Sequence, residues 1–293
     1  MLNRGYTYRS AVQANDQPVL DWLVANFPHS NADTWRQRLA AGELALGDAP
    51  LTETSRLQRG QIVRWARPPW EEPDVPRDFH IIHEDADLLV VNKPSGLPTM
   101  PAGGFLENTL LSLIRRTHPT ASPAHRLGRG TSGLVVFALT PEARSSLTRD
   151  LREHRVQKHY AAIVDGNPTW DALSIEAPIG PVDHPRLRSI FAASPTGKPA
   201  RTDVSVVTRH LRSTSGDVTH VRAQIHTGRP HQIRIHLASV GHPLTGDPLY
   251  GPGGLPKADA LPGDLGYFLH AERLVLQHPT TKEQCTFWCE VPF

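Results

Sequence analysis

The chain has 293 residues, of which 31 are Lys or Arg and 29 are Asp or Glu, so its formal net charge is +2 at pH 7. This length exceeds the usual domain of roughly 100 to 200 residues, and we therefore expect two domains. No run approaches the roughly 20 uncharged residues of a membrane-spanning helix, and the first residues lack the apolar core of a signal peptide. Membrane insertion and export are therefore not expected. The only two cysteines, Cys285 and Cys289, favour neither a disulfide scaffold nor a four-ligand zinc site, and they fit a reducing cytoplasm.

The basic residues are unevenly divided, because only five of the 31 are lysine. Arginine presents a planar fork of donors that suits phosphate oxygens, and it stacks on bases. This balance is typical of an RNA or DNA partner, although biased genome composition is an equally good explanation.

In the first part of the chain, the pattern predicts two helices followed by short strands. Apolar residues at the spacing of one helix face define the first helix: Leu20, Leu23, Val24 and Phe27. The second helix begins after Ser30 and Asn31 and ends at Gly42, with Trp35 and Leu39 facing inward and Arg36 and Arg38 outside. A hairpin around Gly47 and a final strand over residues 61–65 follow.

A proline-rich segment, residues 67–78, marks a domain boundary, because its four prolines exclude both helix and central strand. Beyond it, residues 87–94 form a continuous apolar run that predicts a buried strand. Helices are predicted around Leu106 to Ile114, from the Thr140 cap to about Leu151, and over residues 230–240. Strands are predicted over residues 158–164, 202–207 and 218–225. Strands and helices alternate without a steady βαβ order, so this part is an α+β domain.

Two polar segments are candidates for chemistry. Residues 125–133, His-Arg-Leu-Gly-Arg-Gly-Thr-Ser-Gly, form a glycine-rich loop that leads into an apolar strand. Such a loop can cradle an anion with backbone N–H groups, but a tight structural turn has the same pattern. Residues 227–236 place two arginines and two histidines at a helix start, where anions are favoured.

Other site types are disfavoured by spacing. His226, His231 and His236 are five residues apart, so they do not share one helix face as metal ligands require. Ser132 lacks the Gly-x-Ser-x-Gly elbow of a serine nucleophile. The two cysteines lie on one face of a predicted strand, where they favour core packing.

Taken together, these segments resemble the large RNA pseudouridine synthase family that modifies ribosomal and transfer RNA. In that family the loop of residues 125–133 normally reads His-Arg-Leu-Asp, two variable positions, then Thr-Ser-Gly. Further segments match in the same order: 87–98, 158–164, 178–180 with 196–200, 227–238, 241–251 and 269–274 with 278–279. The resemblance covers about residues 79–293, and residues 1–70 look like the S4-type RNA-binding domain.

The resemblance implies an S4-like α/β domain over residues 1–70, a linker over 71–78, and a catalytic domain over 79–293. The catalytic domain is expected to hold a mixed, mainly antiparallel sheet with flanking helices. The family flips a uridine out of its stack, breaks the bond between ribose and base, rotates the uracil and rejoins it through carbon 5. It uses no metal and no organic cofactor.

The site residues are implied by the same resemblance. The family tyrosine that packs on the base corresponds to Tyr160, and the family arginine that holds the catalytic aspartate corresponds to Arg234. Gly128 stands at the position of that aspartate. The residues expected to bind RNA are Arg36, Arg38, Arg56, Arg59, Arg126, Arg129, Thr131, Arg229 and His231.

The glycine at position 128 leaves two functions open. One is a synthase that isomerises uridine in structured RNA with another group in place of the aspartate, for which Asp183 and Asp247 are the candidates. The other is an RNA-binding protein that keeps the scaffold without the chemistry. If the aspartate is simply lost, Arg234 is expected to lack a carboxylate partner and to face solvent or an anion. We favour the synthase, acting as a monomer on ribosomal rather than transfer RNA.

Overall fold

The computed structural model describes residues 1–213, 216–259, 261, 263 and 265–293. The chain divides into two compact units, Met1–Pro73 and Asp74–Phe293. Each unit has its own hydrophobic core, and the two are described separately.

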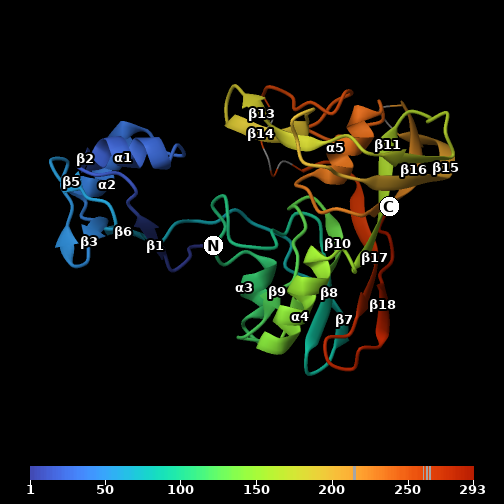
Figure 1. Cartoon of the computed structure of the whole chain (residues 1–293), viewed down its shortest axis with the longest axis horizontal. Helices are drawn as coiled ribbons and strands as arrows, with labels where there is room; N and C mark the ends of the chain where they lie inside the picture. Colours follow the sequence, from blue (N-terminus) through green and yellow to red (C-terminus); the bar gives the residue numbers. More distant parts are fainter. Residues whose placement is uncertain (214–215, 260, 262, 264) are drawn as a thin grey trace. The chain divides into compact units, whose positions relative to one another are not determined.

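The first unit packs two helices, α1 (Val19–Asn26) and α2 (Ala32–Ala40), against a small antiparallel sheet (Figure 1). The sheet has the order β1-β6-β3-β4 and is accompanied by the pair β2–β5. The strand bounds are β1 (Tyr6–Ala11), β2 (Gln17–Pro18), β3 (Leu44–Leu46), β4 (Ala49–Pro50), β5 (Arg56–Leu57) and β6 (Ile62–Arg67). The buried side chains include Trp22, Leu23 and Trp35.

Most predicted features of this unit are present. The Asn31 side chain caps α2 by accepting a hydrogen bond from the backbone N–H of Thr34 at 2.9 Å, as expected for an N-cap residue. The expectation that Arg38 lies outside the core is wrong in part, because its guanidinium stacks at 4.5 Å over the rings of both Trp35 and Trp65. Strand β1 had no clear alternation in the sequence, and its residues are mostly exposed.

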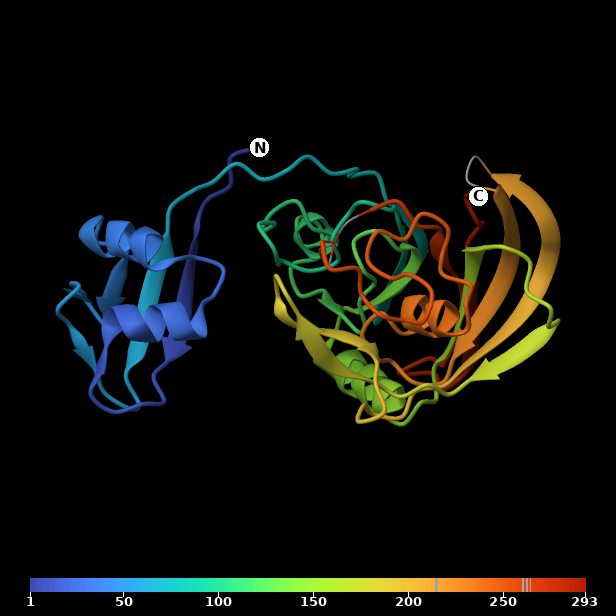
Figure 2. The same ribbon diagram turned by 90° about the horizontal axis from the view of Figure 1, so that it is seen from above.

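The second unit is built on one long mixed sheet with the order β12-β15-β16-β11-β17-β10-β8-β7, to which β18 and β9 add at β17 and β10. The pair β10–β17 is parallel and its neighbours are antiparallel. The strands are β7 (His80–Glu84), β8 (Leu88–Lys93), β9 (Ser122–Pro123), β10 (Ser132–Ala138), β11 (Gln157–Asp165), β12 (Ala172–Ile175), β15 (Thr202–Ser213), β16 (Gly216–Ile225), β17 (Leu269–Gln277) and β18 (Gln284–Trp288). A separate hairpin joins β13 (Ile179–His184) to β14 (Arg188–Ala193). Figure 2 shows the long curved strands β15 and β16 side by side in orange.

In the described part of this unit, three helices pack against the sheet: α3 (Leu110–Ile114), α4 (Pro141–Arg152) and α5 (Gln232–Ser239). The faces of β8 alternate, as strand geometry requires. Leu89 and Val91 join the core that contains α3 and α5, whereas Leu88 and Val90 join the core that contains α4. Because both faces are covered, the strand is a continuous apolar run, which is why it was predictable.

The predicted α+β class is confirmed, with a few local corrections. Thr140 caps α4 through the backbone N–H of Ala143, and Pro141 follows at the first helical position. Helix α3 is shorter than the sequence predicts, because Leu106 lies before it in irregular chain. The loop of residues 125–133 leads directly into β10, as expected.

Gly133 is required where β10 passes β17. Its φ is +108°, and a Cβ there would lie 2.4 Å from the backbone oxygen of Ala271. A side chain at this position would force the two strands apart. The close approach of β10 and β17 therefore sets the position of the glycine-rich loop that precedes β10.

Candidate active site

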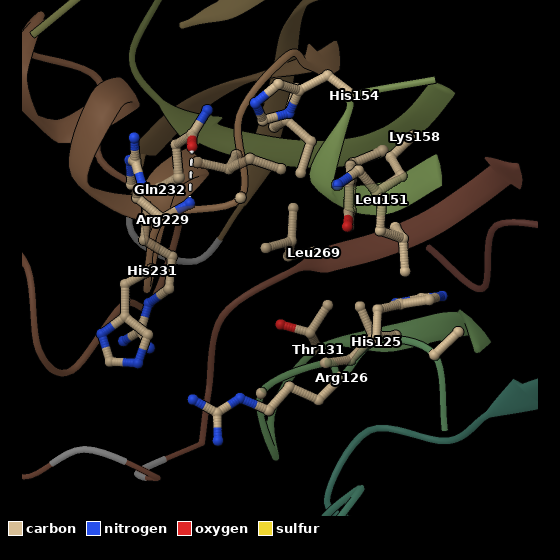
Figure 3. A pocket seen from close by; sticks show the side chains of 18 of the residues that line it. His125, Arg126, Thr131, Leu151, His154, Lys158, Arg229, His231, Gln232 and Leu269 are labelled. Atoms are coloured by element: carbon tan, nitrogen blue, oxygen red, sulfur yellow. Dashed lines mark hydrogen bonds between the residues drawn. The ribbon is translucent and has the colours of Figure 1, made fainter. Parts of the chain in front are cut away.

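A pocket of about 450 Å³ opens in the second unit where the glycine-rich loop, β11 and the start of α5 meet. This volume is within the range of a small-molecule site. Seven of the residues predicted to carry function line it: Arg126, Gly128, Thr131, Tyr160, Arg229, His231 and Arg234. Figure 3 shows Arg229, Gln232 and His231 on one side of the pocket and His125, Arg126 and Thr131 on the other.

Hydrogen bonds from the segment that follows β8 hold the backbone of the glycine-rich loop. Gly96 donates its N–H to the Arg129 carbonyl at 2.8 Å, and Ser95 donates to the Gly130 carbonyl at 2.8 Å. Thr99 donates its hydroxyl to the Leu127 carbonyl at 2.9 Å. These bonds hold the loop backbone in place without using a side chain that faces the pocket.

Arg129 does not line the pocket with the other predicted residues. Its Nε donates to the Gly96 carbonyl at 3.2 Å, and its guanidinium lies 5.0 Å from the ring centroid of Phe105. The side chain therefore ties the loop to its neighbour.

The remaining four arginines predicted to bind RNA lie in the first unit. Arg36 is paired with Asp33 and Glu53, and Arg56 is paired with Asp16. Arg38 stacks on tryptophan rings, and Arg59 is exposed.

Arg234 is held by a carboxylate, which corrects one expectation. Its Nε and Nη2 donate to Asp247 at 2.8 and 2.6 Å, and both side chains are at least 95% buried. Asp247 also accepts the N–H groups of Leu249 and Tyr250 at 2.8 and 3.1 Å. Although burial acts to lower it, the pKa of Arg234 is raised because Asp247 binds the guanidinium. The arginine is therefore neither unpaired nor open to solvent.

The two candidate substitutes for the missing carboxylate do not reach the pocket. Asp183 is exposed on β13, and Asp247 lies behind Arg234 with its carboxylate occupied. Among the described residues that line the pocket, none carries a carboxylate. A substrate there meets arginine, lysine, imidazole, hydroxyl and amide groups.

Two histidines in the pocket wall are neutral at neutral pH. Burial, aided by the charge of Lys158, lowers the pKa of His125 to about 3. Burial, aided by the charge of Arg234, lowers the pKa of His231 to about 4. Both rings therefore act as neutral hydrogen-bonding groups.

Tyr160 stands in β11 with its residue 6% exposed and its ring in the main core. Burial raises the pKa of its hydroxyl, so the phenol is protonated. Ring and strand together provide a rigid aromatic wall, as stacking on a flipped base requires.

Several residues of the pocket were not predicted from the sequence. Gln232 accepts the Arg229 N–H at 3.0 Å and the Thr227 hydroxyl at 2.7 Å, so it shapes the turn before α5 (Figure 3). Lys158 and Tyr267 also line the pocket. Gln232 and Lys158 lie inside segments that match the pseudouridine synthase family, so the sequence could have identified them. Tyr267 lies in a stretch that has no recognisable chemical pattern.

The histidines and the serine that were considered as metal ligands or as a nucleophile do not converge in the pocket. His226, His231 and His236 bond to different partners, which are Asp203, Tyr250, and Thr202 with Ala177. Ser132 lies 2.8 Å from His270 Nδ1, but neither residue lines the pocket. Cys289 is buried beside His270, and Cys285 packs on the same core.

Comparison with known proteins agrees with this arrangement. The family model for RNA pseudouridylate synthase matches residues 87–239. An uncharacterized RNA pseudouridine synthase of Synechocystis is 38% identical over 94% of both chains. RNA pseudouridine synthase 5 of Arabidopsis thaliana is 33% identical, over 94% of this chain and 89% of its own length. Ribosomal large subunit pseudouridine synthase D of Neisseria meningitidis is 34% identical, over 94% of this chain and 75% of its own.

A solved structure, human RNA pseudouridylate synthase domain containing 1, superimposes with a TM-score of 0.60 and 28% identity. It covers 76% of this chain and 87% of its own. The chain therefore belongs to the RNA pseudouridine synthase family, which is a family of isomerases. No helix in the described part of the chain is long and apolar enough to cross a membrane.

Proposed function

We propose that this chain isomerises uridine to pseudouridine in ribosomal RNA, although it carries glycine at the position of the family aspartate. The observation that supports this most directly is the pocket itself. It joins Tyr160, Arg234 and the glycine-rich loop in one cavity of about 450 Å³, and its wall is rich in basic groups.

In this proposal the target nucleotide leaves its stack and enters the pocket. Base flipping costs a few kcal/mol, which contacts in the pocket must offset. Tyr160 stacks on the uracil, and Arg126 and Arg229 neutralise phosphates next to the target. Arg234, held by Asp247, fixes a positive charge at the wall.

Ribosomal RNA is favoured because a relative that matches 94% of this chain is named a ribosomal large subunit pseudouridine synthase. The resemblance of residues 1–70 to an S4-type RNA-binding domain favours the same substrate. The proposal places the reaction in the cytoplasm, with a monomer as the active form.

One observation favours the alternative, an RNA-binding protein without turnover. The described residues that line the pocket include no carboxylate, and Gly128 offers no side chain. An oxygen near the sugar carbon is what most glycosidic bond cleavage requires. Turnover separates the two functions, because both predict RNA binding.

The test is to map pseudouridine in ribosomal and transfer RNA from cells with and without the gene. The proposal expects one or more ribosomal RNA sites to revert to uridine in the deletion strain. Re-expression of the wild-type chain should restore them, and re-expression of Tyr160→Ala should not. If the only sites lost are in transfer RNA, the substrate assignment is wrong, and if no site is lost, the synthase assignment is wrong.

A further inference from the structure

Gly128 leaves an open place in the pocket wall that faces two hydroxyl groups. A Cβ at residue 128 would lie 3.4 Å from Tyr267 Oη and 3.6 Å from Thr131 Oγ1. Gly128 is not among the glycines with positive φ, so its backbone conformation does not itself require glycine. A carboxylate at this position would project into the space beside the Tyr267 hydroxyl.

The Tyr267 ring also packs directly against Gly130. A Cβ at residue 130 would lie 2.9 Å from two ring carbons of Tyr267, closer than packed atoms can approach. The Tyr267 ring therefore fits only because the loop has glycine there. Gly128 and Gly130 together leave the space that this ring and its hydroxyl occupy.

The Tyr267 hydroxyl is held in a fixed place at the pocket wall. It lies 3.2 Å from Thr131 Oγ1, within hydrogen-bonding distance. The Arg234 guanidinium carbon lies 4.2 Å from the ring centroid, and Asp247 fixes that guanidinium from behind. Tyr267 is only 7% exposed, yet it lines the pocket.

Among the described residues lining the pocket, four carry a side-chain oxygen: Thr131, Tyr160, Gln232 and Tyr267. The Gln232 oxygen does not ionise and already accepts two hydrogen bonds. An aliphatic hydroxyl such as that of Thr131 needs an adjacent base to react. Burial raises the pKa of Tyr160, which makes its phenol a poorer proton donor. Tyr267 carries the remaining hydroxyl, and its oxygen is the nearest atom to a Cβ built at Gly128.

We propose that Tyr267 is a catalytic residue whose phenolic oxygen takes the place of the family carboxylate; this rests on the proposed function. Tyrosine is the nucleophile in some glycosidases, so the chemistry has a precedent. The Tyr267 oxygen bonds to C1′ of the ribose while the C1′–N1 bond breaks. The electron pair of that bond stays on the uracil, and the phenolic proton passes to N1.

The second half returns the tyrosine to its starting state. The released uracil rotates, C5 bonds to C1′, and the C1′–oxygen bond breaks with its electron pair returning to the phenol oxygen. The proton lost from C5 then goes to that oxygen. The net result is an isomerisation in which no oxidant, reductant or added group is consumed.

The experiment compares wild type with Tyr267→Phe in single-turnover isomerisation of a ribosomal RNA fragment, with RNA affinity and thermal midpoint measured alongside. We expect the rate to fall at least about a hundredfold, while the RNA affinity stays within about threefold. A smaller loss of rate would assign the hydroxyl to packing. Tyr250→Phe, which removes a buried hydroxyl near Arg234 outside the pocket lining, is the matched control and should keep the rate within about tenfold.

Two further measurements keep the proposal testable if Tyr267→Phe is poorly folded. Replacement of Tyr267 by 3-fluorotyrosine keeps the shape of the ring and withdraws electrons from the phenolic oxygen. Because that oxygen forms and breaks the bond to C1′, the single-turnover rate should change by about threefold or more, and an unchanged rate contradicts the proposal. The double variant Gly128→Asp, Tyr267→Phe should be at least about tenfold faster than Tyr267→Phe, because the carboxylate then has the vacated space.

The wild-type result separates the two proposals. If both the wild type and Tyr267→Phe are active, the catalytic role of Tyr267 is contradicted and the proposed function stands. A wild type that binds RNA without turnover contradicts the proposed function and the role of Tyr267 with it.

Discussion

Arg234 and Asp247 form a buried ion pair whose geometry fixes one positive charge at the pocket wall. Two charge-assisted hydrogen bonds of 2.6 and 2.8 Å join them, and two backbone N–H groups occupy the carboxylate further. Asp247 is thus fully engaged in holding the arginine. This argues that it positions Arg234 and does not replace the family aspartate.

Removing the charge of Asp247 tests this role. Asp247→Asn leaves Arg234 buried without a neutralising partner, so the free energy of unfolding should fall by about 3 to 5 kcal/mol in denaturant titration. Asp183→Asn, at an exposed site on β13, is the matched control and should change it by less than about 0.5 kcal/mol. If the two substitutions lower the free energy of unfolding equally, the ion pair between Asp247 and Arg234 does not stabilise the fold.

Tyr160 should contact the extruded base. Stacking on an aromatic ring contributes about 1 to 3 kcal/mol, so Tyr160→Ala should weaken binding of a target-containing RNA by about tenfold or more. RNA in which the target uridine is absent should bind the variant and the wild type alike. Fluorescence titration of the two RNAs gives both affinities, and an equal loss for both would make the ring a packing residue only.

At the scale of elements, the segment after β8 holds the glycine-rich loop. Lys93 is fully buried, and its ammonium donates to the carbonyls of Pro94 and Leu97 at 2.9 and 2.8 Å and lies 3.4 Å from that of Arg129. Burial lowers the pKa of Lys93 from 10.5 to about 7. One lysine therefore connects the end of the buried strand to the glycine-rich loop.

This lowered pKa has a consequence for stability. Between pH 7 and 10.5 the unfolded chain keeps the Lys93 proton and the folded chain releases it, so stability should rise with pH above about 7. The slope contributed by one such group is at most about 1.4 kcal/mol per pH unit. Lys93→Met should remove this rise, whereas Lys198→Met, at an exposed site, should keep it. A difference between wild type and Lys93→Met that stays constant from pH 7 to 9 would contradict the prediction.

Elements with strong local signals were predictable. Strand β8 reads as an unbroken apolar run because both of its faces are buried, and α4 has a threonine cap followed by proline. Strands β1 and β7 were not predicted, since their residues are mostly exposed. Strand β1 also pairs with β6, which is distant in the sequence, whereas β7 pairs with β8, the next strand along the chain. The predicted helix was longer than α3, because Leu106 fits the helical spacing but lies outside the helix.

The site was predictable only as far as its matched segments reach. Tyr160, Arg234 and the glycine-rich loop were identified from residues that occur together in the family. The Asp247 partner of Arg234 could not be derived by pattern, because it depends on how the chain folds back after α5. Tyr267 was missed for the same reason, since its contact with Gly128 and Gly130 spans more than 130 residues.

At the scale of the whole molecule, residues 1–73 form a separate compact unit that we expect to supply RNA affinity. The four arginines of this unit that were predicted to bind RNA differ in their present contacts. Arg36 and Arg56 have acidic partners that compete with phosphate, whereas Arg38 stacks on two tryptophans and Arg59 is exposed.

Replacing all four arginines with alanine should weaken RNA binding and flatten its salt dependence. Each phosphate contact contributes about 0.7 to 0.9 to the slope of log affinity against log salt. The double variant Arg36→Ala, Arg56→Ala should account for the smaller part of the change, because those two charges are already neutralised by Asp33, Glu53 and Asp16. If the slope of log affinity against log salt is the same in the quadruple variant as in the wild type, these four arginines do not bind RNA.

Tritium release tests most directly whether the wild-type chain isomerises uridine without an aspartate at residue 128. Purified wild-type protein is mixed with ribosomal RNA that carries tritium at C5 of uridine, and the label that enters water is counted. We predict release that rises to a plateau of one tritium for each modified site, with pseudouridine found at that site after nuclease digestion. Tight binding of the same RNA with no release above the protein-free background would contradict the account and leave an RNA-binding protein on a synthase scaffold.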